Sequence, residues 1–130
     1  MLASPRWSLR PDACMAYRIE FSADAERDFG LIFEHLYASY SALGESAAEA
    51  LDHAERRTLA IRAAVARIAL APHRGERHDG LLPGLRHLSL ERAIYWFEVD
   101  GQTQRVRVLA VFFGGQDHVH LMLERLLPGE

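Results

Sequence analysis

The stretch AIYWFEVDGQTQRVRVLAVFF, residues 93–113, decides the fold of this chain. Both of its ends are rich in β-branched and aromatic residues, which favour strands, and Asp100-Gly101 between them begins a turn. We therefore expect strands over residues 93–100 and 105–113 that pair as an antiparallel hairpin. Simple alternation along the second strand places four of its side chains on one face of the sheet. These are Val106, Val108, Ala110 and Phe112.

The segments on either side of this hairpin complete an α+β domain. LRHLSL, residues 85–90, is typical of a third strand, and AYRIEF, residues 16–21, of an N-terminal one. Between them, two apolar stripes at helical spacing predict a helix from Ser22 to Gly44 and a second helix that begins with the capping box SAAE and ends before Pro72. Residues 72–84 are interpreted as a loop, and QDHVHLMLERLL, residues 116–127, as a final helix. The expected fold is a helical hairpin packed on a small antiparallel sheet, with a C-terminal helix.

Composition limits both the domain organisation and the classes of function. With 130 residues the chain forms one domain, which we place at residues 15–130. Residues 1–14 show no periodic apolar face and are expected to be a disordered tail, and Met15 is an alternative start of translation. The formal net charge of −3 provides no general attraction to nucleic acid or to a membrane. A single cysteine, Cys14, and the lack of a signal or spanning segment predict a cytoplasmic protein.

Two histidines near the C-terminus, His118 and His120, raise the question of a metal site. Residues two positions apart on a helix point about 200° apart, so these side chains would not converge on one ion. A zinc site also needs three or four ligands, and His73, His78 and His87 would contribute only if the loop folded back. We therefore expect no metal and no cofactor, and we interpret His118 and His120 as surface residues in the first helical turn.

Arginines are the remaining candidates for function. All 15 basic residues are arginine, and no Gly-x-Ser-x-Gly motif or phosphate-binding loop is present. Arg86 begins one strand and Arg92 precedes the next, so both lie on the sheet, where guanidinium groups suit anionic partners. Arginines at strand ends also keep sheet edges unpaired, and this structural explanation stays open for each of them.

Three segments together identify a family. YRIEFSADAERDFGLIFEHL (residues 17–36), PGLRHLSLERAIYWFEVD (83–100) and VRVLAVFFGGQDHVHLMLERLL (106–127) resemble the ParE/RelE superfamily of toxins from bacterial type II toxin-antitoxin systems. The most specific parts are Pro-Gly-Leu-Arg at residues 83–86 and the strand-to-helix segment over residues 108–117. The resemblance implies the fold described above, and it implies a cognate antitoxin as partner, with DNA contacted only through that antitoxin.

The superfamily contains two mechanisms, and the resemblance leaves both open. RelE-like members cleave messenger RNA on the ribosome, and on that alternative the catalytic candidates are Arg86, Arg92, His118 and His120. ParE-like members inhibit DNA gyrase and are not enzymes. The Gly-Gln-Asp segment after the last strand and the lack of lysine favour the ParE-like branch. On this favoured interpretation five residues bind the target: Arg86, Arg92, Gln116, Asp117 and His118.

Overall fold

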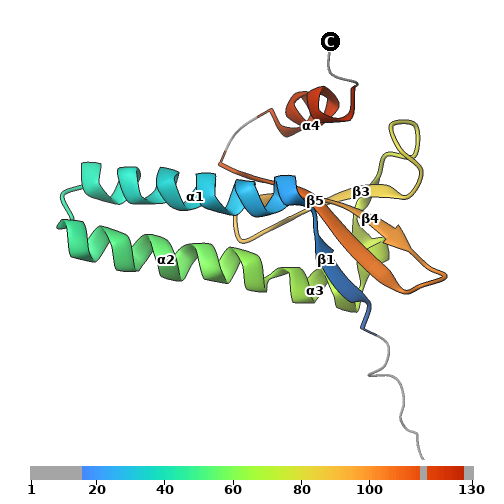
Figure 1. Ribbon diagram of the computed structural model, residues 1–130, viewed down its shortest axis with the longest axis horizontal. Coiled ribbons are helices and arrows are strands. Elements are labelled where there is room, and N and C mark those ends of the chain that lie inside the picture. The colour runs from blue at the N-terminus through green and yellow to red at the C-terminus, as the bar shows by residue number, and fades with distance from the viewer. Residues whose placement is uncertain (1–15, 115–116, 128–130) are drawn as a thin grey trace, which may run out of the picture.

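The computed structural model describes residues 16–114 and 117–127 (Figure 1). The predicted tail over residues 1–14, the possible start at Met15, and Gln116 lie outside the described residues. The elements are β1 (Arg18–Phe21), α1 (Ala23–Ala42), α2 (Ala47–Ala63), α3 (Val65–Leu70), the 3₁₀ helix η1 (Pro72–Arg74), β2 (Glu76–Arg77), β3 (Leu85–Leu90), β4 (Ala93–Asp100), β5 (Arg105–Phe113) and α4 (His118–Leu126).

The strands form one sheet in the order β1-β5-β4-β3-β2. The β4–β5 hairpin predicted from sequence is at its centre, with Asp100 opposite Arg105. Two features differ from the expected antiparallel sheet. β1 lies parallel to β5 at one edge of the sheet, although the helices and three strands separate the two in the chain. The loop after α3 contributes a short antiparallel strand, β2, at the opposite edge. The predicted α+β class is confirmed.

The helical hairpin of α1 and α2 covers one face of the sheet and extends beyond it (Figure 1). Three of its predicted helix ends are confirmed: the start of each helix and the end of the first. The Ser22 hydroxyl accepts a hydrogen bond from the Ala25 backbone, and Ser46 and Glu49 form a capping box. Gly44 follows α1 with a φ of 102°, a left-handed conformation that suits glycine. The second predicted helix is divided at its end into α2 and the short α3.

A β-bulge in β5 overturns the simple alternation predicted for this strand. Trp96 is opposite Ala110 while the next residue of β4, Phe97, is opposite Val108, so Leu109 is the extra residue. Val108 therefore packs with the helical hairpin, whereas Ala110 packs in a second core cluster with Trp96 on the other face. That second face is covered by α4 through Met122, which is 2% exposed. The bulge thus gives β5 an apolar side chain on both faces of the sheet.

Asp28 is the only buried acidic or basic residue among the described ones, with 3% exposure. It lies on α1 beside the part of β5 that extends past the end of β1. One carboxylate oxygen accepts a hydrogen bond of 2.9 Å from the Val111 backbone. Arg125 of α4 pairs with both carboxylate oxygens at 2.7 and 2.8 Å. The Asp28 side chain therefore accepts the hydrogen bond of a β5 backbone N–H that has no strand partner, and it connects α1, β5 and α4.

Candidate functional site

Three histidines from separate segments gather on the face of the sheet that α4 covers. We call His78, His87 and His118 the histidine cluster. His78 follows β2 and its backbone N–H bonds to the Leu85 carbonyl, which continues the pairing of β2 with β3. His87 lies on β3 and His118 is the first residue of α4. The loop over residues 72–84 therefore folds back onto the sheet, and this brings together side chains that are far apart in sequence.

The rings of the cluster surround Trp96, whose side chain is fully buried. The ring centroids of His78 and His87 lie 4.7 and 4.9 Å from that of Trp96. The indole N–H donates a hydrogen bond of 3.2 Å to Nδ1 of His118. That bond requires a lone pair on Nδ1, so His118 carries its ring proton on Nε2 when neutral. Trp96 thus fixes both the positions of the rings and the tautomer of one of them.

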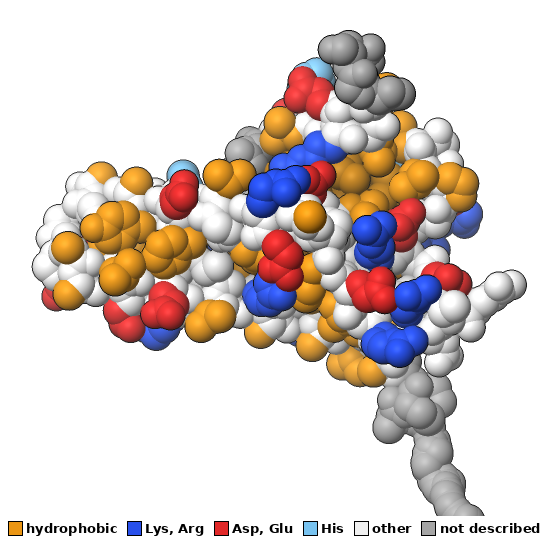
Figure 2. Space-filling view, in the orientation of Figure 1, with side chains coloured by type: hydrophobic (Ala, Val, Ile, Leu, Met, Phe, Trp, Pro, Cys, Tyr) orange, Lys and Arg blue, Asp and Glu red, His pale blue; other side chains and the backbone are white. Residues whose placement is uncertain are grey.

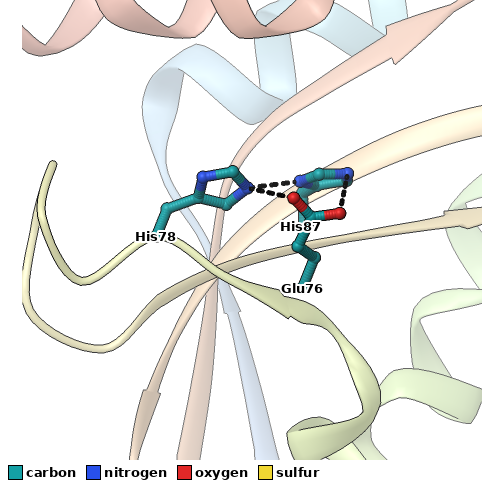
Figure 3. A group of neighbouring side chains, drawn as sticks. All are labelled: Glu76, His78 and His87. Atoms are coloured by element: carbon teal, nitrogen blue, oxygen red, sulfur yellow. Dashed lines mark hydrogen bonds and ion pairs between the residues drawn. The ribbon is translucent and has the colours of Figure 1, made fainter.

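Glu76 adds a carboxylate to the histidines (Figure 3). It lies opposite His87 in the pairing of β2 with β3. Nε2 of His78 lies 2.8 Å from Nδ1 of His87 and 3.7 Å from the Glu76 carboxylate, and Nε2 of His87 lies 3.9 Å from that carboxylate. The imidazoles are mostly shielded, with side-chain exposures of 17% and 14%, while Glu76 is 70% exposed.

The surroundings keep His87 neutral near physiological pH. Burial lowers the pKa of His87 below its usual value, and the neighbouring His118 lowers it further. A neutral imidazole presents one ring nitrogen with a free lone pair. This nitrogen can accept a proton or bind a metal ion.

Arg86 and Arg92, which were both predicted to bind the target, are separated by the length of β3. Arg86 is opposite Phe97 and so lies on the face of the helical hairpin, not on the face of His87. Its guanidinium donates to the carbonyls of His73 and Gly75, at 3.2 and 3.0 Å. Arg86 therefore braces the turn before β2. Arg86 and Arg92 do not lie side by side, because Arg86 is near the start of β3 and Arg92 follows its end.

Arg92 lies in the two-residue turn between β3 and β4, at a φ of 63°. Its neighbour Glu91 also has a positive φ, 55°, but is tied to the helices, since Arg57 bonds its carbonyl and Arg67 its carboxylate. Arg92 is exposed, and its side chain has no hydrogen bond or ion pair with any other described residue. Its carbonyl accepts from Gly114 at 3.5 Å, so Arg92 lies near the end of β5, as predicted.

The first turn of α4 separates its two histidines, as the helical spacing predicts. Asp117 caps the helix by accepting from the His120 backbone at 3.2 Å. His120 is exposed and lies 3.1 Å from Glu124 on the outer side of α4, whereas His118 faces Trp96. The interpretation of His118 as a surface residue is therefore only partly right, because its half-buried ring contacts Trp96 where α4 lies against the sheet.

A shallow apolar groove runs between α1 and α2 on the helical hairpin. It has a volume of about 460 Å³. Figure 2 shows hydrophobic side chains gathered along this exposed part of the hairpin. Leu51 and Leu59 of α2 are 51% and 57% exposed, and they line the groove with Phe29 and Phe33 of α1. Exposed leucines on an otherwise amphipathic helix are typical of a surface that binds another chain.

No protein-family model and no curated protein matches the chain. Within the described residues no helix is sufficiently long and apolar to cross a bilayer.

Solved structures do match. The chain superposes on a chain of the chromosomal ParDE toxin-antitoxin system from P. aeruginosa with a TM-score of 0.56 and 19% identity, over 78% of this chain and 99% of that one. It superposes on a chain of the toxin-antitoxin complex RelBE2 from Mycobacterium tuberculosis with a TM-score of 0.53 and 15% identity, over 78% and 95%. For a mutant of E. coli toxin RelE in the free state the TM-score is 0.53 at 13% identity, over 87% and 100%. The resemblance seen in the sequence is thereby confirmed at the level of the fold, and this chain has the fold of the ParE and RelE toxins.

Proposed function

We propose that this protein is the toxin of a type II toxin-antitoxin system, neutralised by a cognate antitoxin. The observation that carries the proposal is the fold match, which spans almost the whole length of the toxin-antitoxin chains that the protein resembles. This is an inference from fold to function, and the residues of the site must support it independently.

The antitoxin is proposed to bind the helical hairpin and the adjoining sheet surface through an amphipathic C-terminal segment. The groove that contains Leu51 and Leu59 supports this proposal, because it offers apolar contacts that no other part of residues 16–114 and 117–127 covers. Glu55 and Arg62 border the same groove and provide polar contacts at its rim. We expect the neighbouring reading frame to encode this partner, a short protein with a DNA-binding N-terminal part. DNA is then contacted only through the antitoxin.

For the target we propose DNA gyrase, which the toxin inhibits by binding. The separation of the candidate catalytic residues supports a binding mechanism. A ribonuclease needs its proton-transfer groups and its cations around one phosphate. Here Arg86 lies on the opposite face from His118, Arg92 lies at the far turn of β3, and His120 points away from the sheet.

Arg92 is the residue we propose at the centre of the target-binding surface. A two-residue hairpin turn of this kind requires positive φ at both of its residues, and a non-glycine side chain at such a position costs about 1 kcal/mol or more. Arg92 has this conformation and is exposed, and its carbonyl accepts a hydrogen bond from Gly114 at the end of β5, which leads towards Asp117. Asp117 and His118 are proposed to extend the same surface, as is Gln116, which lies outside the described residues. Arg86 is proposed to support that surface indirectly.

The histidine cluster is the one observation that favours the alternative, a ribosome-dependent endoribonuclease of messenger RNA. Imidazoles are the commonest groups for proton transfer near neutral pH, and three of them meet here. In that mechanism His118 supplies an N–H at Nε2, and His87 or His78 supplies the base.

Expression in a bacterial host tests the proposal. The protein alone should arrest growth, and co-expression of the neighbouring reading frame should restore growth and yield a complex on co-purification. Plasmid supercoiling and primer extension on messenger RNA, measured in the arrested cells, separate gyrase inhibition from RNA cleavage. Normal growth on induction of soluble, folded protein would contradict the proposal.

A further inference from the structure

The arrangement of Glu76, His78 and His87 has the character of a metal site. Residues two apart on a strand point to the same side, and Glu76 and His78 have this spacing along β2 and its continuation. The cross-strand partner of Glu76 is His87, so all three side chains meet on one face of the sheet (Figure 3). One ligand atom from each residue lies within 4.8 Å of the others.

The spacing of the donors fits a tetrahedral ion. Zinc binds imidazole nitrogen and carboxylate oxygen at about 2.0–2.2 Å, which places two ligand atoms of a tetrahedron about 3.3 Å apart. The observed separations are 2.8 Å between the two histidines and 3.7 Å between His78 and Glu76. The third pair, between His87 and Glu76, lies within 4.8 Å. A coordination sphere therefore requires displacements of about half an ångström between His78 and its two partners, and of at most about 1.5 Å between His87 and Glu76, and the ion then replaces the hydrogen bond between the imidazoles.

The two imidazoles are held in position before any ion arrives. Both rings pack on Trp96, which limits their rotation. The backbone is also constrained, because a side chain at Gly75 would approach the His87 carbonyl to 2.9 Å, so this close contact requires glycine. Asp79 fixes the loop after His78 by accepting from the Gly84 backbone at 2.9 Å. Metal binding therefore costs little conformational entropy at the two histidines, because their side chains are already ordered.

The remaining histidine of the cluster does not complete the ligand set. Nδ1 of His118 accepts the Trp96 indole N–H, which assigns its ring proton to Nε2. Glu76 is the exposed member of the three, so the ion would have a side open to solvent. Two histidines, one glutamate and one open position form a ligand set of the kind used by catalytic zinc sites.

We propose that Glu76, His78 and His87 bind one zinc ion or a similar divalent transition metal, with water at the fourth position. The ion cross-links β2 to β3 and fixes the folded-back loop. This reverses the expectation from sequence, which assumed that residues 72–84 remain a loop. The inference does not depend on the proposed toxin activity, and its test requires no activity assay.

Full-length protein without an affinity tag is freed of metal with EDTA, dialysed, and titrated with ZnCl₂ by calorimetry and with CoCl₂ by visible absorption. We expect one equivalent of zinc to bind, a rise of several degrees in Tm, and the absorption bands of tetrahedral cobalt. His78→Gln and Glu76→Gln should each weaken binding by about tenfold or more. Glu76→Gln keeps the test valid if the shielded histidine variant fails to fold, because Glu76 is exposed.

His120→Gln is the matched control. His120 also lies close to a carboxylate, at 3.1 Å from Glu124, but no third ligand from the described residues joins them. Its zinc affinity should equal that of the unaltered protein. The proposal is overturned if the unaltered protein takes up no zinc at micromolar concentrations, or if Glu76→Gln and His120→Gln bind zinc equally well.

Discussion

Removing the carboxylate of Asp28 should destabilise the protein more than any other single change at a polar side chain. In Asp28→Ala the Val111 N–H loses its acceptor, and Arg125 loses two charge-assisted hydrogen bonds. An unsatisfied buried N–H costs about 1–3 kcal/mol, and breaking a buried ion pair costs about 3–5 kcal/mol in total. We expect a loss of about 3–5 kcal/mol in the free energy of unfolding, with α4 released from the sheet.

The partner substitution should cost less. Arg125→Met leaves Asp28 its bond to Val111. The Asp28 side chain is only 4% exposed, but shortening the 30% exposed Arg125 side chain opens space through which water can approach the carboxylate. We expect a loss of about 2–3 kcal/mol. The bond to Asp28 raises the pKa of Arg125, which agrees with a favourable pairing. In the double variant the two losses should not add, and the coupling should be about 1 kcal/mol or more.

Urea unfolding followed by circular dichroism gives these free energies. Tryptophan fluorescence adds a local readout, because Trp96 lies in the cluster that α4 covers. The reasoning is refuted if Asp28→Ala costs less than about 1 kcal/mol, or if the losses in the double variant are strictly additive.

Arg92→Gly should raise the free energy of unfolding by about 0.5–1 kcal/mol, since glycine tolerates the φ of 63°. Both Arg92→Gly and Arg92→Ala should abolish toxicity, and retained toxicity in growth assays would exclude Arg92 from the target surface. His118→Gln and His120→Gln should each keep most toxicity, because a binding contact costs about 1–2 kcal/mol whereas loss of a general acid or base costs 10²–10⁴-fold in rate. Abolished cleavage of messenger RNA in a ribosome assay of either variant would instead support the ribonuclease. Burial raises the pKa of Tyr95. Above about pH 10 the unfolded chain therefore loses the phenolic proton of Tyr95 while the native protein keeps it, so the free energy of unfolding falls as pH rises. Tyr95→Phe should lower the free energy of unfolding by about 1 kcal/mol at neutral pH, because it removes the 2.6 Å hydrogen bond to the Ile61 carbonyl. In urea titrations it should also flatten the alkaline decline in that free energy. An equally steep decline would show that Tyr95 is not its cause.

Local patterns were sufficient to predict the helices and the main strands. Ser22, Ser46 with Glu49, and Gly44 mark helix ends by interactions within a few residues, so the sequence around them contains the whole signal. The β-bulge at Leu109 gave no such signal. The residues on both sides of Leu109 are apolar, so either alternation is compatible with the sequence and only pairing with β4 selects one.

The candidate site depended on contacts between distant residues. Glu76 and His78 belong to a two-residue strand inside a segment rich in glycine and proline, where turn signals outweigh strand signals. Residues two apart on a strand share a face, so recognition of β2 in the sequence would have placed Glu76 and His78 on the same side. One feature of the sequence could have predicted the role of Asp28. It is an acidic residue beside the apolar stripe of α1, and a carboxylate buried at such a position needs a partner.

The most direct test of the proposed function is the supercoiling of relaxed plasmid by purified DNA gyrase in the presence of this protein. The account predicts that the folded protein inhibits supercoiling in a concentration-dependent manner, that Arg92→Gly does not, and that His120→Gln inhibits as strongly as the unaltered protein. Full supercoiling at toxin concentrations well above that of gyrase, together with cleavage of ribosome-bound messenger RNA by the same preparation, would contradict it.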